Sequence, residues 1–104
     1  MSYITVDPPR HIEATVTARV RDVLEYWMWL RIPKGDKATW HVLGYRRSDG
    51  LPYVTSPLLA ADPVSHRVQT TSGSTYLLEW QSEAPNLRLN AHLWEALRLW
   101  KVET

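Results

Sequence analysis

The sequence predicts an α+β domain with an N-terminal helix, a curved antiparallel sheet of four strands, and a C-terminal helix. Two segments with apolar residues at helical spacing predict the helices, and a middle region in which apolar and polar residues alternate predicts the sheet. The chain has 104 residues, which is the length of one domain, so we take residues 1–104 as a single unit.

The N-terminal helix is expected within residues 15–32, which read TVTARVRDVLEYWMWLRI. The residues that recur at spacings of three and four are Val16, Val20, Val23, Leu24, Trp27 and Leu30. Such a stripe is typical of an amphipathic helix, and Pro33 with Gly35 would end it. Tyr26 and Trp29 lie off the stripe, so we expect both rings to be exposed.

The first two strands of the sheet are expected at residues 39–46 and 53–60. The first alternates and is rich in aromatic and β-branched residues, and the turn Ser48-Asp49-Gly50 follows it. The second contains Pro57, which cannot donate to a ladder, so it should be an edge strand or a strand bent at this residue.

The other two strands are expected at residues 67–71 and 74–80, after a turn at residues 62–65. Between them, Thr71-Ser72-Gly73-Ser74 has residue types that also occur in phosphate loops. A phosphate loop opens a helix, however, and here alternating β-formers follow the glycine. The stretch therefore predicts a tight hairpin with Gly73 at positive φ.

The C-terminal helix is expected at residues 90–101, with Asn90 as its N-cap. Its apolar stripe consists of Leu93, Trp94, Leu97 and Trp100. Helices at both ends of the chain would then cover one face of the sheet.

The residues that could carry chemistry do not form a recognisable set. The chain has no cysteine, and its four histidines fall on four different elements without the spacing of a zinc site. Asp62 and His66 could meet across a turn, but a proline-fixed turn explains Asp62 without catalysis. We therefore expect a protein that is not an enzyme and has no metal ion, cofactor or catalytic residue.

The apolar segments are too short to cross a membrane. The longest, residues 23–32, is interrupted by Glu25 and Arg31, and residues 1–13 lack the apolar run of a secretory signal. These features predict a cytoplasmic protein without membrane contact.

Aromatic and basic residues give the strongest indication of function. The chain has six Trp and five Tyr but no Phe, which favours rings at the boundary between core and solvent. Interface hot spots favour Trp, Tyr and Arg. The candidate partner-binding residues are Tyr26, Trp29, Arg31, Trp40, Arg46 and Arg47. They predict a non-enzymatic protein-binding module; the same residues could instead bind single-stranded nucleic acid, or join two copies in a homodimer.

Residues 55–80, TSPLLAADPVSHRVQTTSGSTYLLEW, resemble a pattern found in short proteins of bacteriophages and prophages. The residues that carry the resemblance are Thr55, Ser56, Asp62, Val68, Thr70, Ser72, Gly73, Ser74, Tyr76 and Leu78. The resemblance implies an origin in a mobile element, where small cysteine-free proteins often bind and block a host protein or ribonucleoprotein complex. Inhibitors of CRISPR effectors, or anti-CRISPR proteins, are one such class.

Overall fold

The computed structural model describes residues 4–5 and 8–82, and this part of the chain consists of β-strands and connecting segments. The elements are β1 (Ile4–Thr5), the 3-10 turn η1 (Arg10–Ile12), β2 (Asp22–Lys34), β3 (Lys37–Arg46), β4 (Pro52–Val54), β5 (Leu58–Asp62), β6 (Arg67–Thr70) and β7 (Thr75–Gln81). The described residues contain no α-helix, so the predicted α+β class is wrong. The predicted helix at residues 90–101 lies outside the described residues.

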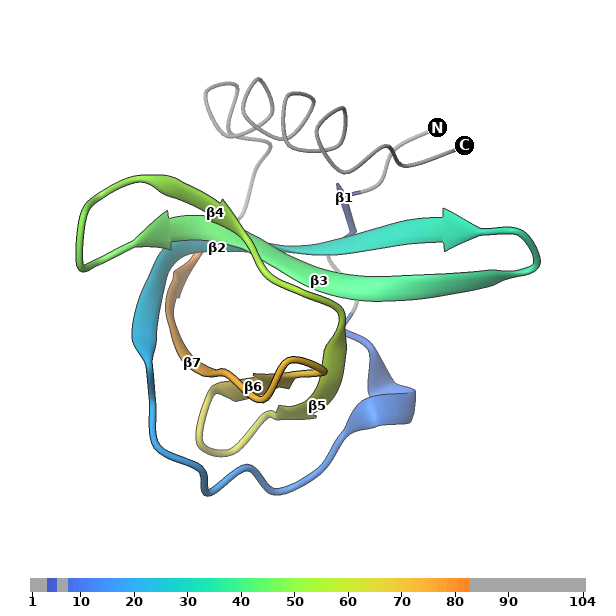
Figure 1. Ribbon diagram of the computed structural model, residues 1–104, viewed down its shortest axis with the longest axis horizontal. Coiled ribbons are helices and arrows are strands. Elements are labelled where there is room, and N and C mark those ends of the chain that lie inside the picture. Colours follow the sequence, from blue (N-terminus) through green and yellow to red (C-terminus); the bar gives the residue numbers. More distant parts are fainter. Residues whose placement is uncertain (1–3, 6–7, 83–104) are drawn as a thin grey trace.

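The seven strands form one mixed sheet. Six of them follow the order β4-β3-β2-β7-β6-β5, and β1 pairs with β2 beside this path. All pairs are antiparallel except β2 with β7, which is parallel, so the expected four-stranded antiparallel sheet is also wrong. The sheet is curved as expected, and it curls so far that β5 and β6 lie opposite β2 and β3, with β7 between them (Figure 1).

The core fills the inside of this curl. Its buried members come from five strands and are Leu24, Trp27, Trp29, Val42, Leu58, Ala61, Val68, Tyr76 and Leu78. Trp27 and Trp29 pack edge to face, with ring centroids 4.8 Å apart and ring planes at 80°. This geometry adds a favourable electrostatic contact to the large apolar area that two tryptophans bury.

The predicted N-terminal helix is wrong because residues 22–34 form strand β2. Trp27 and Trp29 face the core, and the residues between and after them, Met28, Leu30 and Ile32, are buried as well. Side chains alternate between the two faces of a strand, so β2 is buried on both faces here. The sequence of such a strand is a continuous apolar run without period-two alternation. An apolar run of this kind also contains apolar residues at the spacings of three and four that indicate a helix.

The expected strand at residues 53–60 is interrupted, as its proline predicted. The chain forms β4, leaves the ladder at residues 55–57, and re-enters the sheet as β5 at the opposite edge. Thr55 fixes this break, because its backbone N–H donates to the Val42 carbonyl and its hydroxyl accepts from the Val42 N–H. The Thr55 carbonyl lies 2.8 Å from Nδ1 of the buried His41.

The hairpin prediction for Thr71-Ser72-Gly73-Ser74 is confirmed. β6 and β7 pair antiparallel on either side of it, and Gly73 has φ of 91°. The Thr70 N–H donates to the Ser74 carbonyl at 2.8 Å, and the Gly73 N–H donates to the Thr70 carbonyl at 3.0 Å. Backbone bonds within the turn thus account for its conformation without a bound ligand.

Candidate functional site

Two aromatic residues hold an unusual backbone conformation at the same level of neighbouring strands. Tyr26 in β2 has φ of 51° and Trp80 in β7 has φ of 56°. The parallel register pairs Glu25 with Glu79 before them and Trp27 with Gln81 after them, so the two residues occupy matching positions. Bulky residues rarely adopt this left-handed region, and each costs on the order of 1–3 kcal/mol.

The conformation turns both rings out of the molecule. Leu24 and Leu78 are register partners in the core, so strand alternation would direct the next pair two residues on, Tyr26 and Trp80, into the core as well. Instead Tyr26 is 56% exposed and Trp80 is 68% exposed. Trp27 takes the inward place in β2. We call Tyr26 and Trp80 the aromatic pair.

The neighbouring strand β3 is shaped to fit this bend. Its register with β2 shifts between Glu25 and Met28, so that two residues of β2, 26 and 27, lie opposite the single residue Gly44 of β3. This is a β-bulge. A Cβ atom on Gly44 would lie 3.1 Å from Cβ of Trp27 and 3.2 Å from the Glu25 carbonyl oxygen. The bulge thus depends on the lack of a side chain at Gly44.

Arg47 links the two strands that carry the aromatic pair. Its Nε donates to Glu25 at 3.1 Å, and its Nη2 donates to Glu79. Each carboxylate belongs to the residue directly before one of the exposed rings. The hydrogen bonds to Glu25 and then to Glu79 raise the pKa of Arg47 above its ordinary value. Arg47 therefore bridges the two strands directly beside the aromatic pair.

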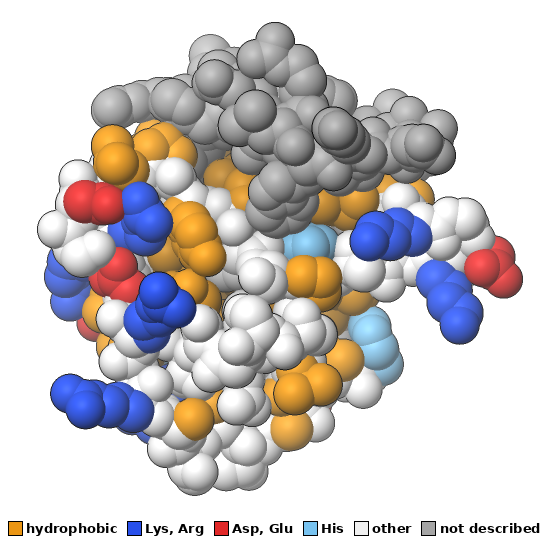
Figure 2. Space-filling model, viewed as in Figure 1, with side chains coloured by type: hydrophobic (Ala, Val, Ile, Leu, Met, Phe, Trp, Pro, Cys, Tyr) orange, Lys and Arg blue, Asp and Glu red, His pale blue; other side chains and the backbone are white. Residues whose placement is uncertain are grey.

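Arg31 and Trp40 lie away from the aromatic pair, toward the β2–β3 hairpin. They are register partners, Arg31 is exposed, and Trp40 is half-buried against the core with its ring centroid 6.3 Å from that of His11. The hairpin projects beyond the rest of the sheet (Figure 1), and basic side chains lie on its projecting end together with an acidic one (Figure 2). The structure thus divides the predicted residues between the two ends of β2.

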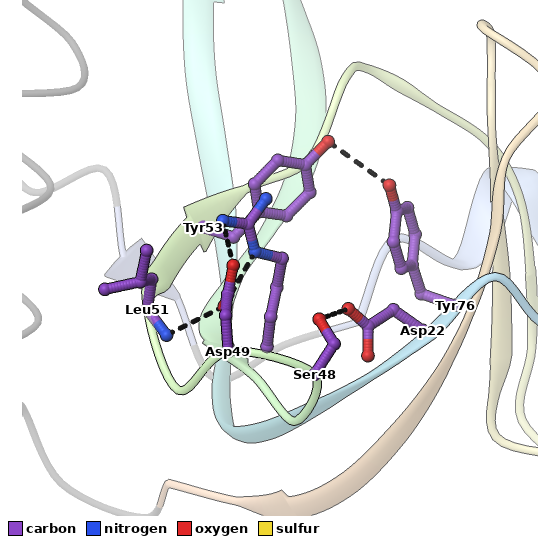
Figure 3. A network of polar contacts seen from close by, with 7 residues as sticks. Asp22, Ser48, Asp49, Leu51, Tyr53 and Tyr76 are labelled. Carbon is purple, nitrogen blue, oxygen red and sulfur yellow. Dashed lines mark hydrogen bonds and ion pairs between the residues drawn. The ribbon is translucent and has the colours of Figure 1, made fainter.

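Arg46 is engaged within its own turn. Its Nε and Nη2 donate to the two carboxylate oxygens of Asp49 at 3.2 and 2.7 Å, and its guanidinium lies 5.0 Å from the ring centroid of Tyr53 (Figure 3). The Tyr76 hydroxyl donates to the Tyr53 hydroxyl at 3.2 Å. Burial raises the pKa of Tyr53 to about 12, so this phenol stays protonated and cannot act as a base near neutral pH. Arg46 therefore stabilises the β3–β4 turn.

Trp29 is buried at 8% exposure, contrary to the exposed position that the helical prediction assigned to it. Of the six predicted residues, only Tyr26 and Arg47 lie at the bend. Trp80 was missed, because the alternation of Tyr76, Leu78 and Trp80 placed its ring inside the sheet with the other two. Its outward position depends on one backbone angle, for which the sequence gives no signal.

Both carboxylate oxygens of Asp62 are engaged by backbone groups of the fold. Its Oδ2 accepts the Val16 N–H at 2.9 Å, and its Oδ1 accepts the N–H groups of Val64 and Ser65. These bonds, chiefly the one from Val16, lower the pKa of Asp62 to about 2. The carboxylate lines a cavity of about 80 Å³ whose other walls include Pro9, Trp27 and Trp29. This cavity is mainly an apolar gap at the end of the core.

Comparison of the chain with protein families, with curated proteins and with solved structures finds no match. Within residues 4–5 and 8–82, no three His, Cys, Asp or Glu side chains are grouped so that they could hold a metal ion. In the same part of the chain, no helix has the length and apolar character needed to cross a membrane. The aromatic pair with its Arg47 link is therefore the candidate functional site.

Proposed function

We propose that this chain is a non-enzymatic protein-binding module whose contact surface centres on the aromatic pair. One observation carries the proposal: two large rings that strand alternation would bury are turned into solvent at matching positions of adjacent strands. Backbone strain in non-glycine residues clusters at functional sites, because the surrounding structure must offset its cost. A partner that buries both rings accounts for it.

The chemistry of the surface supports protein binding. Tyr and Trp are the residues that most often dominate interface energies, since a large rigid ring loses little conformational entropy on burial. Arg47 fixes the strands beneath the rings through Glu25 and Glu79, so the surface is formed before the partner arrives. The partner expected from the resemblance of residues 55–80 is a host protein or ribonucleoprotein complex, such as a CRISPR-type defence complex.

The proposal is tested by comparing Trp80→Ala with Val64→Ala in capture experiments from host extract. Val64 is an apolar side chain that is 87% exposed in the β5–β6 turn, so it is a matched control outside the site. We expect a captured protein whose affinity falls about thirtyfold with Trp80→Ala, a typical hot-spot loss, and stays unchanged with Val64→Ala. Equal capture by the wild type and both variants would refute the proposal.

A second function, binding of single-stranded nucleic acid, is favoured by one observation. Arg31, Lys34 and Lys37 are exposed near the half-buried ring of Trp40, and they form no ion pair with any residue in the described ranges. Stacking rings beside basic groups are typical of such binding. Arg46 and Arg47, in contrast, are already paired with carboxylates. Salt-sensitive binding of labelled oligonucleotides that is lost with Lys34→Glu/Lys37→Glu would favour this function over protein binding.

A further inference from the structure

The tip of the β2–β3 hairpin carries positive charge in an arrangement that is unfavourable for an isolated molecule. Lys34 and Lys37 are direct register partners across the turn formed by Gly35 and Asp36. Like charges at paired positions repel each other and destabilise a hairpin. Both lysines are exposed, and among the described residues neither they nor Asp36 take part in an ion pair. The tip is therefore suited to a partner with negative charge.

The aromatic pair offers the complementary chemistry. Glu25 and Glu79 flank the two rings, and Arg47 compensates only one of the two carboxylate charges. The faces of Tyr and Trp rings attract cations as well, since the ring quadrupole is negative there. Exposed rings beside an excess of carboxylate thus favour a Lys or Arg side chain from a partner.

The two surfaces cannot meet within one molecule. Tyr26 and Lys34 are eight positions apart along β2, which at about 3.3 Å per residue is roughly 25 Å. They also lie toward opposite ends of the hydrogen-bonded β2–β3 pair, which cannot fold back on itself. Complementary surfaces at opposite ends of a rigid element allow contact only between molecules.

We propose that a second copy of this chain binds the aromatic pair, with the basic hairpin tip of one molecule seated on Tyr26 and Trp80 of the next. This inference rests on the proposed function only in taking the aromatic pair as a contact surface. The contact joins two different surfaces head to tail, so it can extend to a third copy or close into a ring. A hairpin tip on two rings buries less area than a standard interface of about 1,600 Å², so the association is weak.

Sedimentation over a range of protein concentrations tests the inference with four forms of the chain. The wild type should show a mass that rises with concentration, and added salt should reduce this rise because it screens the charges. Trp80→Ala lacks a ring of the pair, and Lys34→Glu/Lys37→Glu reverses the charge of the tip. Each of these variants alone should remain monomeric. The control Arg10→Glu/Arg19→Glu makes the same change in net charge at exposed positions outside both surfaces and should associate like the wild type.

A mixture of the two defective variants gives the decisive result. Trp80→Ala retains an intact tip, and Lys34→Glu/Lys37→Glu retains an intact aromatic pair. Their mixture should form a one-to-one dimer that cannot grow, because only one productive contact remains between them. A mixture that stays monomeric while the wild type associates would overturn the head-to-tail arrangement.

Other outcomes separate this inference from the proposed function. The wild type could be monomeric at all concentrations and still capture a host protein that Trp80→Ala does not bind. This result would overturn the inference and leave the proposed function intact. Self-association that needs the tip but not Trp80 would also overturn the inference. Salt-sensitive oligonucleotide binding that needs Lys34 and Lys37, in a wild type that does not self-associate, would assign the lysines to nucleic acid and overturn it as well.

Discussion

Left-handed residues occur in two kinds of place in the described part of this molecule, the turns between strands and the bend of β2 and β7. In the turns, Gly73 adopts positive φ without a side chain to strain, and His66 adopts it where hydrogen bonds to Asp62 hold the preceding residues. In the bend, Tyr26 and Trp80 adopt positive φ inside strands, where the chain does not reverse its direction.

The comparison separates positive φ that the fold needs in order to form a turn from positive φ that forms no turn. A turn gains a reversal of the chain from its left-handed residue, and glycine supplies it at low cost. The bend gains only the outward direction of two rings. Serine and glycine at Thr71-Ser72-Gly73-Ser74 therefore mark a structural turn, whereas the aromatic pair marks the candidate site. Variants at the two regions should behave differently.

The largest effect on stability is expected from Trp29→Ala. Its comparison with Trp80→Ala tests whether Trp29 is a core residue while Trp80 is exposed at the surface. Trp29 is buried against Trp27, so its loss should leave a cavity and lower the free energy of unfolding by about 3–5 kcal/mol. Trp80→Ala should change it by less than ~0.5 kcal/mol, as is typical of an exposed site. Denaturant unfolding measures both, and similar losses would mean that the two rings are equally buried.

Gly44→Ala should destabilise the bend by about 1–3 kcal/mol, the usual cost of an added group in a well-packed region. The new methyl group would meet Cβ of Trp27 and the backbone oxygen of Glu25, neither of which is the end of a flexible side chain. Thermal or denaturant unfolding gives the value. A variant as stable as the wild type would show that the bulge can open without loss.

Gly73→Val should destabilise the β6–β7 turn by about 1–3 kcal/mol, because a β-branched residue is strained at positive φ. No atom lies within 4 Å of the position of its Cβ, so the expected loss comes from the backbone conformation alone. The melting temperature should fall while binding of any partner at the aromatic pair is retained. Loss of binding at unchanged stability would instead assign a direct role to the turn.

Tyr26→Gly should raise the free energy of unfolding and not lower it, because it removes a side chain from a strained backbone. Relief of the left-handed conformation contributes about 1–2 kcal/mol, and the greater freedom of glycine in the unfolded chain offsets about 0.5–1 kcal/mol of it. A net gain of up to ~1.5 kcal/mol in unfolding free energy is expected, together with weaker partner binding. A clear loss of stability would show that the Tyr26 ring supports the fold.

The last prediction concerns acid stability at the β5–β6 turn, and the pH dependence that it describes is confined to acid solution. The pKa of Asp62 is about 2 in the folded protein against an ordinary 3.8. The stabilisation by its carboxylate is therefore complete above pH 3.8 and is lost as the pH falls through about 2. Melting temperatures between these pH values should fall less steeply for Asp62→Asn than for the wild type. Parallel curves would contradict the assignment.

The sequence predicted local features of this fold better than its overall arrangement. The strand at residues 39–46, the break at Pro57 and the hairpin at Gly73 follow from alternation and from residues with special backbone preferences. β2 was mistaken for a helix because Leu24 and Trp27 both face the core across the bulge, and an extra residue in a strand reproduces the spacing of three that a helix shows. Burial on both faces removed the remaining alternation.

The candidate site was predicted only in part, for a related reason. Tyr26 was expected to be exposed, although on helical grounds, and Arg47 was named with it among the candidate partner-binding residues. The position of Trp80 beside Tyr26 depends on the parallel pairing of β2 with β7, and no short-range pattern in a sequence specifies a partner that distant. A left-handed tyrosine or tryptophan is equally hidden, because neither residue type favours that conformation.

The parallel pairing of β2 with β7 also affects how the chain reaches its fold. β2 and β3 are adjacent in sequence and join through a short turn, so they can form a hairpin within microseconds. Asp22 pairs with Tyr76, on the order of 50 residues later, and closing so long a loop is slow because its entropy is lost before the contacts form.

During synthesis at about 5–20 residues per second, β2 therefore waits several seconds for β7 to emerge. For that time a strand that contains Trp27, Met28 and Trp29 lacks its β7 neighbour along one edge. An apolar strand with an unpaired edge is a template for joining other chains. The yield of folded protein should consequently fall as the rate of expression rises, and chaperones that cover apolar strands should restore it.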